Sequence, residues 1–352
     1  MSLTAHPWLG GLFGDAETAA LLSPEREIRT MLRIEAAHAR ALGAVGRVDP
    51  TLAQEAATAI LAHVPDMTAL HQGTAQDGVV IPALVAGLKA DLPERLHPAL
   101  HKPLTSQDVI DTALCIALQG VVDLFLTRID GLTATLDGLE GRFGDQPLMA
   151  RTRMQAALPS TVGARLRAWR APLDRHRARV TALRPLIGVI QLGGAVGDRR
   201  GWGDEAGQVA DSMAKELGLI AVPCWQTERD RMAGLAAALA ALTGSLGKIG
   251  QDVALMAELS PAEVRLAGGG ASSAMPHKSN PVLAELLVAL ARHTATLSGG
   301  MQQAMIHEQE RSGAAWTLEW LTLPDLVQTA GRALTAAAEM LDRVEGLGTP
   351  RA

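Results

Sequence analysis

A glycine- and serine-rich segment in the C-terminal half carries the side chains best suited to chemistry. It reads Ala-Gly-Gly-Gly-Ala-Ser-Ser-Ala-Met-Pro-His-Lys-Ser-Asn-Pro from Ala267 to Pro281. Consecutive glycines and serines disfavour helix, and glycine reaches backbone conformations that other residues avoid. The stretch therefore predicts a mobile loop, followed by Asn280 as an N-cap and Pro281 as the first helical residue. Lys278 would then lie just before a helix N-terminus.

Composition alone also fits a simpler interpretation, a surface loop followed by a capped helix. The string Ser-Ser-x-Met-Pro-x-Lys-x-Asn-Pro, complete from residue 272 to 281, resembles the signature of the fumarase/aspartase superfamily. Its length and fixed spacing argue against a chance match. The resemblance implies that Ser272 transfers a proton and Lys278 stabilises negative charge. It also implies three substrate-binding residues in the same string: Ser273, Met275 and Asn280.

A second segment, His-Lys-Pro-Leu-Thr-Ser-Gln-Asp from residue 101 to 108, resembles the first signature region of the same superfamily. The resemblance implies substrate binding by His101, Thr105 and Ser106. His101 is also an alternative proton-transfer residue, ahead of His277, where the family does not fix histidine. Thr105 and Asp108 have the spacing of a capping box, which is compatible with binding because helix N-termini attract anions.

A third segment, Arg-Thr-Arg-Met-Gln-Ala-Ala-Leu-Pro-Ser-Thr from residue 151 to 161, resembles the second signature region. The resemblance implies that Thr152 and Gln155 contact substrate. Relatives place a catalytic histidine directly after this threonine or directly after this glutamine. Here those positions are Arg153 and Ala156, so the resemblance assigns no general acid.

The segment from His307 to Trp320 contains Gly-Ala-Ala-Trp-x-x-Glu-Trp and resembles bacterial carboxymuconate cycloisomerases. Trp316 and Trp320 also fit a pair of core aromatics at i and i+4 on a helix. The resemblance implies reversible lactonisation of 3-carboxy-cis,cis-muconate in protocatechuate degradation, through an aci-carboxylate intermediate. The expected partner is a small anionic tricarboxylate, with no cofactor and no metal. Alternatives are a sibling lyase for adenylosuccinate, argininosuccinate or aspartate, and a catalytically silent structural member.

The composition is that of a globular protein, and the charge gives little support for nucleic-acid binding. Of its 352 residues 48% are hydrophobic and 20% charged, the formal net charge is -5 and the pI is about 6.1. Cys115 and Cys224 are predicted to be reduced thiols, and no His/Cys cluster has the spacing of a zinc site. The N-terminal residues lack the pattern of a signal peptide. The apolar run Val109–Leu126 includes two aspartates, which would be costly in lipid, so we expect a cytoplasmic protein and no membrane span.

Alanine- and leucine-rich segments, with almost no β-branched alternation, predict an all-α fold. Helices are predicted over residues 24–45, 51–63, 78–91, 107–142, 159–184, 226–258, 280–299 and 317–344. Residues 1–100 are expected to form an N-terminal helical domain and residues 101–346 a central long-helix bundle. The small C-terminal domain of longer relatives is expected to be absent.

The long helices have apolar faces too extensive for the neighbours that one subunit provides. They therefore predict a core shared between subunits. The resemblance implies a homotetramer of D2 symmetry, in which bundles from four subunits form that core. It further implies that each active site takes residues from three subunits.

Overall fold

The computed structural model describes residues 6–270, 274–275 and 279–349 of the chain. Long α-helices dominate this part, with two short 3-10 helices and two sheets of two antiparallel strands each. In chain order the elements are α1 (Gly10–Phe13), α2 (Ala16–Leu21), α3 (Pro24–Ala44), α4 (Pro50–Ala62), α5 (Met67–Asp77), α6 (Ile81–Asp91), η2 (Glu94–Ala99), α7 (Ser106–Phe143), β1 (Pro147–Thr152), β2 (Gln155–Thr161), α8 (Val162–Ile187), η3 (Arg200–Glu205), α9 (Ala206–Leu217), α10 (Asp230–Glu258), β3 (Val264–Leu266), α11 (Val282–Gln303), α12 (Ala314–Asp342) and β4 (Val344–Leu347).

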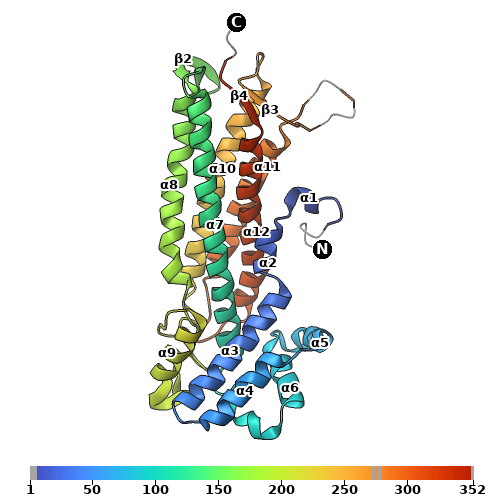
Figure 1. The fold of residues 1–352 in the computed structure, drawn as a ribbon, viewed down its shortest axis with the longest axis vertical. Coiled ribbons are helices and arrows are strands. Elements are labelled where there is room, and N and C mark those ends of the chain that lie inside the picture. Colours follow the sequence, from blue (N-terminus) through green and yellow to red (C-terminus); the bar gives the residue numbers. More distant parts are fainter. Residues whose placement is uncertain (1–5, 271–273, 276–278, 350–352) are drawn as a thin grey trace.

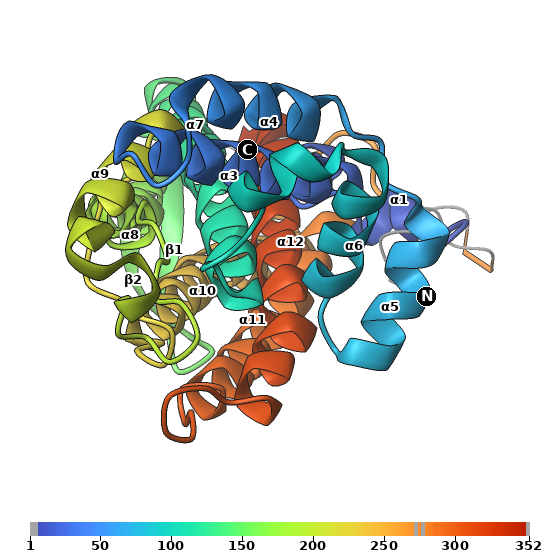
Figure 2. The same cartoon turned by 90° about the horizontal axis from the view of Figure 1, so that it is seen from below.

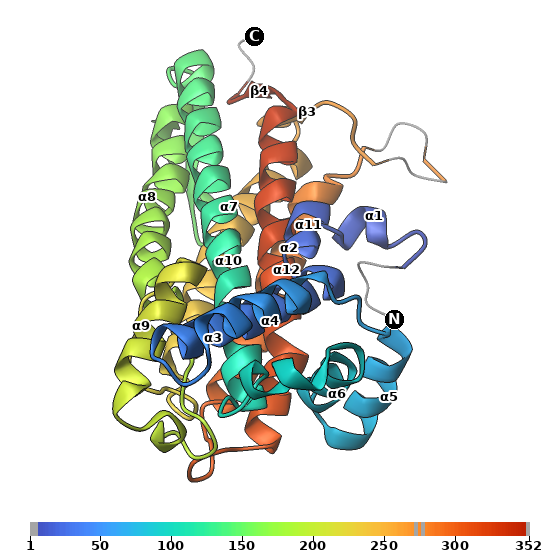
Figure 3. The same cartoon turned by 60° about the horizontal axis from the view of Figure 1, so that its bottom comes forward.

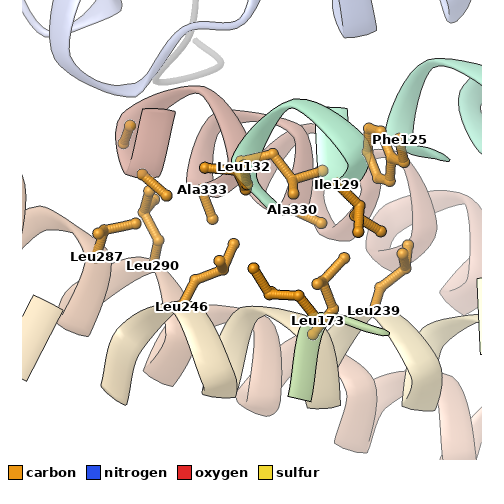
Figure 4. Close-up of a cluster of buried hydrophobic side chains, with 14 of the residues drawn as sticks. Phe125, Ile129, Leu132, Leu173, Leu239, Leu246, Leu287, Leu290, Ala330 and Ala333 are labelled. Atoms are coloured by element: carbon orange, nitrogen blue, oxygen red, sulfur yellow. The ribbon is translucent and has the colours of Figure 1, made fainter. Parts of the chain in front are cut away.

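An elongated bundle of α7, α8, α10, α11 and α12 forms the body of the molecule (Figure 1). On α7 the buried positions alternate in steps of four and three residues along one face: Leu118, Val122, Phe125, Ile129, Leu132, Leu136 and Leu139. This spacing keeps one stripe of a long helix against its neighbours. Figure 4 shows Phe125, Ile129 and Leu132 of α7 in one cluster with leucines and alanines from the other four helices.

A ladder of ion pairs accompanies this stripe between α7 and α8. Successive acids of α7 face arginines of α8 in antiparallel order: Asp123–Arg184, Asp130–Arg177, Asp137–Arg170 and Glu140–Arg167. The three aspartates are spaced seven residues apart, which is the same period as the buried stripe. Exposed pairs of this kind contribute little energy each, so their main effect is to fix the register of the two helices.

Helices α4, α5, α6 and α9 gather at one end of the bundle, where α3 and α4 cross its axis (Figures 2 and 3). They enclose a second hydrophobic core, which also includes Val109 and Ile110 of α7 and Trp202 and Val209 from the segment around α9. The indole Nε1 of Trp202 donates to Nε2 of the buried His38 at 3.1 Å. The predicted domain boundary near residue 100 stays a prediction. Residues from before and after this boundary contribute to the second core.

The predicted all-α class is confirmed, and the long helices lie close to their predicted bounds. Two local predictions are wrong. The helix expected from Pro159 begins at Val162, because residues 147–161 form the β1–β2 hairpin. Asn280 is not an N-cap: its backbone pairs with Gly270, and α11 begins at Val282 with no side-chain cap.

Helices α7 and α10 are long and apolar enough to cross a membrane, by length and composition alone. This is weak evidence, because core helices pass the same test, and 56% of each apolar window is buried inside the chain. The prediction of a buried bundle helix over residues 109–126 is consistent with this position.

Candidate active site

The first turn of α7 brings together three of the predicted substrate-binding residues. Thr105 is the N-cap, and its backbone N–H donates to the Asp108 carboxylate at 2.9 Å, so the predicted capping box is present. Ser106 is the first helical residue and is partly exposed. His101 lies one short turn earlier, where its carbonyl oxygen accepts from the Leu104 N–H.

Asp108 also fixes a loop against this helix end. It is fully buried and accepts the N–H of Gly193 at 2.6 Å and that of Gly194 at 3.0 Å. Glycine is required here because a Cβ on Gly193 would lie 2.4 Å from the Cys224 sulfur, and Gly194 has a φ of +68°. Burial raises the pKa of Asp108 to about 6, although three backbone N–H donors and the Arg311 charge oppose the rise.

A cavity of about 770 Å³ opens beside the first turn of α7. Ser106 lines it on one side, and Arg311 with the first turns of α12 lines the other. The exposed Arg311 guanidinium donates to the carbonyl oxygens of Gly194 and Ala195, both at 3.3 Å. A hydroxyl, a helix N-terminus and a guanidinium are together suited to bind a carboxylate.

A buried ionic network supports this end of the bundle. The Arg229 guanidinium contacts Asp111 at 2.7 Å and also pairs with Glu319; all three side chains are at most 1% exposed. The indole Nε1 of Trp316 donates to Asp111 at 3.1 Å. Burial raises the pKa of Glu319 against the opposing charge of Arg229. The network ties α7, α10 and α12 together behind the cavity, and the predicted core position of Trp316 is confirmed.

Thr152 and Gln155 lie at the tip of the β1–β2 hairpin. They face each other in the strand register, and both are exposed. Arg153 and Met154 form the turn with φ values of 49° and 66°. Two positive φ values are typical of the tight turn that suits a hairpin, usually built from asparagine and glycine. The turn therefore places Arg153, rather than a histidine, between the two predicted substrate-binding residues in the chain.

The glycine–serine segment joins β3 to α11. Its base is closed by a pair of hydrogen bonds between the backbones of Gly270 and Asn280, each 2.9 Å long. Met275 is 42% exposed, and the Asn280 side chain is partly exposed. The predicted catalytic residues Ser272 and Lys278, with Ser273, lie outside the described residues.

Within one chain the His101 group lies far from the hairpin. The His101 group precedes α7, whereas the hairpin follows it, and 38 helical residues separate them. At about 1.5 Å per residue, α7 is about 57 Å long. The described base of the glycine–serine segment follows β3, at the end of the bundle where Glu263 contacts Arg151 of the hairpin (Figure 1). The length of α7 agrees with the predicted separation of the His101 group from the hairpin.

Several residues of this end were not identified from the sequence. Glu35, on α3, contacts His101, and Arg311 lines the cavity. The sequence could have indicated Glu35, because this charged residue lies on the apolar stripe of its helix between Met31 and Leu42. The described residues contain no group of three or more His, Cys, Asp or Glu side chains arranged to hold a metal ion.

Comparisons with known proteins agree with this architecture. The family model described as Lyase matches residues 29–294. A 3-carboxy-cis,cis-muconate cycloisomerase of Pseudomonas aeruginosa is 37% identical over 349 residues, which cover 97% of this chain and 76% of that protein. A nitrosuccinate lyase of Streptomyces davaonensis is 33% identical over 341 residues, covering 92% and 71% of the two chains.

Solved structures give the same result. The 3-carboxy-cis,cis-muconate lactonizing enzyme from Pseudomonas putida superimposes with a TM-score of 0.89 at 33% identity, covering 97% of this chain and 77% of that chain. A fumarate lyase from Mesorhizobium superimposes with a TM-score of 0.88 at 31% identity, covering 95% and 76%. Signature strings, helical bundle, family model and relatives all agree: this chain belongs to the lyase family of the fumarase/aspartase superfamily.

Proposed function

We propose that this chain is a 3-carboxy-cis,cis-muconate cycloisomerase, an intramolecular lyase that forms carboxymuconolactone reversibly in protocatechuate degradation. The observation that carries the proposal is the 37% identity to a cycloisomerase along almost the whole chain. The enzymes from Acinetobacter baylyi and Bradyrhizobium diazoefficiens, which have the same name, are 33% and 34% identical over 95% and 99% of this chain. The lactonizing enzyme from Pseudomonas putida supports it structurally.

The proposed reaction needs only charge stabilisation and one proton transfer. In ring closure, a carboxylate oxygen of the substrate forms a C–O bond to an alkene carbon. The π electrons move into the conjugated carboxylate and give an aci-carboxylate, which is then protonated at its α-carbon. No external oxidant, reductant or group donor is consumed. Hydrogen-bond donors and a cation placed at the developing charge can contribute several kcal/mol in a dry site.

The missing histidines fit this reaction better than they fit a sibling lyase. An amine expelled from adenylosuccinate, argininosuccinate or aspartate must be protonated, which requires a general acid. In the reverse lactonisation the leaving group is a carboxylate, which is stable without a proton at neutral pH. Arg153 and Ala156, in the positions of the family histidines, are therefore compatible with a carboxylate leaving group.

Within this proposal the signature string supplies the chemistry and the other groups hold the substrate. Ser272 moves the α-carbon proton, and Lys278 stabilises the aci-carboxylate. A serine needs a nearby cation and desolvation to act as a base. The remaining carboxylates are held by side chains from all three groups: His101, Thr105, Ser106, Thr152, Gln155, Ser273, Met275 and Asn280.

Assembly is a further part of the proposal. Residues about 57 Å apart along α7 cannot contact one small substrate within one chain. A homotetramer of D2 symmetry would bring the His101 group, the hairpin and the signature string together from different subunits. We place this tetramer in the cytoplasm, with α7 and α10 packed among helices rather than lipid.

The deciding experiment mixes purified protein with 3-carboxy-cis,cis-muconate and follows the loss of conjugated-diene absorbance. We expect turnover that requires no added metal or cofactor. Parallel assays with nitrosuccinate, adenylosuccinate, argininosuccinate and aspartate test the sibling activities. Turnover of one of these in place of the muconate would replace the proposed substrate, and no turnover of any would favour a catalytically silent member.

A further inference from the structure

Glu35 is a buried carboxylate with a single polar partner in the described part of the chain. It lies on the buried face of α3, its side chain is 0% exposed, and Met31 and Leu42 flank it on that face. Its Oε1 atom lies 2.7 Å from Nδ1 of His101, and its Oε2 atom has no hydrogen-bond partner among the described residues. Because a buried charge is expensive unless it is paired, stability alone does not explain this carboxylate.

His101 is held by its backbone as well as by this contact. Its φ of 59° lies in the left-handed region, which for a residue with a side chain costs on the order of 1–3 kcal/mol. The ring turns Nδ1 toward Glu35, and the side chain is 16% exposed. Nε2 makes no hydrogen bond to any described residue. One ring nitrogen is therefore engaged inside the fold, while the other is available to a ligand.

The neighbouring histidine, His38, does not balance the Glu35 charge. His38 lies one turn beyond Glu35 on α3 and is fully buried. Burial, together with a smaller effect of the nearby His101, lowers the pKa of His38 to about 3. His38 therefore stays neutral and cannot compensate the Glu35 charge. Among these three groups, His101 is the one that can balance Glu35.

We infer that Glu35 is a positioning residue for the proposed reaction: it orients His101, whose Nε2 then binds a carboxylate of the substrate. With a proton on each nitrogen, the imidazolium donates to Glu35 on one side and to the ligand on the other. This inference rests on the proposed function, because it assigns a role to His101 at the same site. It adds a residue that lies outside all three signature segments.

The test compares binding and turnover in Glu35→Gln, His101→Gln and the double variant. Glutamine at position 35 can still accept from Nδ1 but carries no charge. Each single variant should raise KM roughly tenfold or more, in line with the loss of a charged hydrogen bond, with a smaller change in kcat. The double variant should resemble His101→Gln alone, because Glu35 acts through His101. Glu27→Gln, a control on the same helix, should leave KM unchanged.

A binding measurement separates failure of this inference from failure of the proposed function. Tricarballylate, an unreactive tricarboxylate, is titrated into the same proteins by calorimetry, and its affinity should fall in parallel with the rise in KM. If the wild type does not turn over the muconate, this titration alone decides the role of Glu35. Wild-type affinity in Glu35→Gln, additive losses in the double variant, or no binding to the wild type would each overturn the inference.

Glu35→Asp covers the case in which the glutamine variant does not fold. The shorter side chain keeps the charge but withdraws it from Nδ1. It should bind tricarballylate more weakly than the wild type and more tightly than His101→Gln. Affinity below that of His101→Gln, in a protein with a normal circular-dichroism spectrum, would show that Glu35 acts otherwise than through His101.

Discussion

Two polar residues on α3 show what a hydrophobic pattern can and cannot predict. The stripe of apolar positions indicates which face of residues 24–45 is buried, and Glu35 and His38 both lie on that face. The pattern does not show their partners, because those come from residues 101 and 202. A partner so distant along the chain depends on how separate elements pack together. The spacing of hydrophobic residues within one helix does not predict that packing.

His38 should make the fold sensitive to mild acid. Its pKa is lowered from 6.5 to about 3 by burial, so the unfolded chain binds a proton that the folded chain excludes. Stability from this group is present above pH 6.5 and is lost as the pH falls toward 3. At pH 5 the loss is about 2 kcal/mol.

The measurement is urea unfolding at pH 7.5 and pH 5 at constant protein concentration. Because other groups also titrate in this range, the comparison is with His38→Gln, which keeps an acceptor for the Trp202 indole. The variant should lose less stability than the wild type between the two pH values. Equal losses would show that His38 is not the group responsible.

The paired serines of the signature string give a second residue-scale prediction. The resemblance selects Ser272 for proton transfer and gives Ser273 a supporting role. Ser272→Ala should lower turnover by about 10²–10⁴, as for the loss of a positioned acid–base group, while substrate affinity changes little. Ser273→Ala should be milder. If only Ser273→Ala is inactive, the assignment is wrong by one residue; if both stay active, His101 becomes the leading candidate.

At the scale of elements, long helices were predicted well and the hairpin was missed. The buried positions on α7 alternate in steps of four and three residues for many turns, so the sequence clearly predicts a helix there. The hairpin has no such period: β2 is exposed along most of its length and contains Pro159. The hairpin is held instead by contacts distant in sequence, such as Arg151 with Glu263 at 2.8 Å.

The buried ion pairs of Arg229 yield a prediction about the contact between α7, α10 and α12. Arg229→Met would leave Asp111 and Glu319 buried without their cation. Removing one partner of a buried pair typically costs about 3–5 kcal/mol. Glu319→Gln should cost less, because burial already raises the pKa of Glu319 and favours its neutral form.

Chemical unfolding of the two variants measures this difference directly. We expect the Arg229→Met midpoint to fall well below that of Glu319→Gln, with the first turn of α7 and the cavity disturbed as well. A variant at Arg184 on the exposed α7–α8 ladder is the matched control and should change stability by less than about 1 kcal/mol. Equal stabilities of Arg229→Met and wild type would show that the network is not needed for folding.

At the scale of the whole molecule, the length of α7 is the feature that favours the proposed assembly. Its signature segments are short, yet the folded chain holds the His101 segment and the hairpin segment on opposite sides of the long helix α7 in chain order. The strings predicted which residues act together, and the helix lengths predicted that one chain could not unite them. The relative placement of subunits depends on surface complementarity, which neither the strings nor the helical periods describe.

Complementation between inactive variants tests this assembly. His101→Ala and Gln155→Ala should each be nearly inactive, but a mixture that exchanges subunits should recover activity. If a site takes His101 from one subunit and Gln155 from another, about a quarter of the sites in a random equal mixture carry both native residues. The mixture should therefore approach one quarter of wild-type activity. Light scattering should give the mass of a tetramer throughout.

The matched control combines His101→Ala with Thr105→Ala. These two residues lie at the same end of α7, so one subunit supplies both to any given site. Every site in that mixture keeps one substitution, whatever the exchange of subunits, and no activity should return. Equal recovery in the two mixtures would contradict the sharing of sites between subunits. A fully active monomer in light scattering would contradict the assembly itself, because then one chain must unite residues that α7 holds about 57 Å apart.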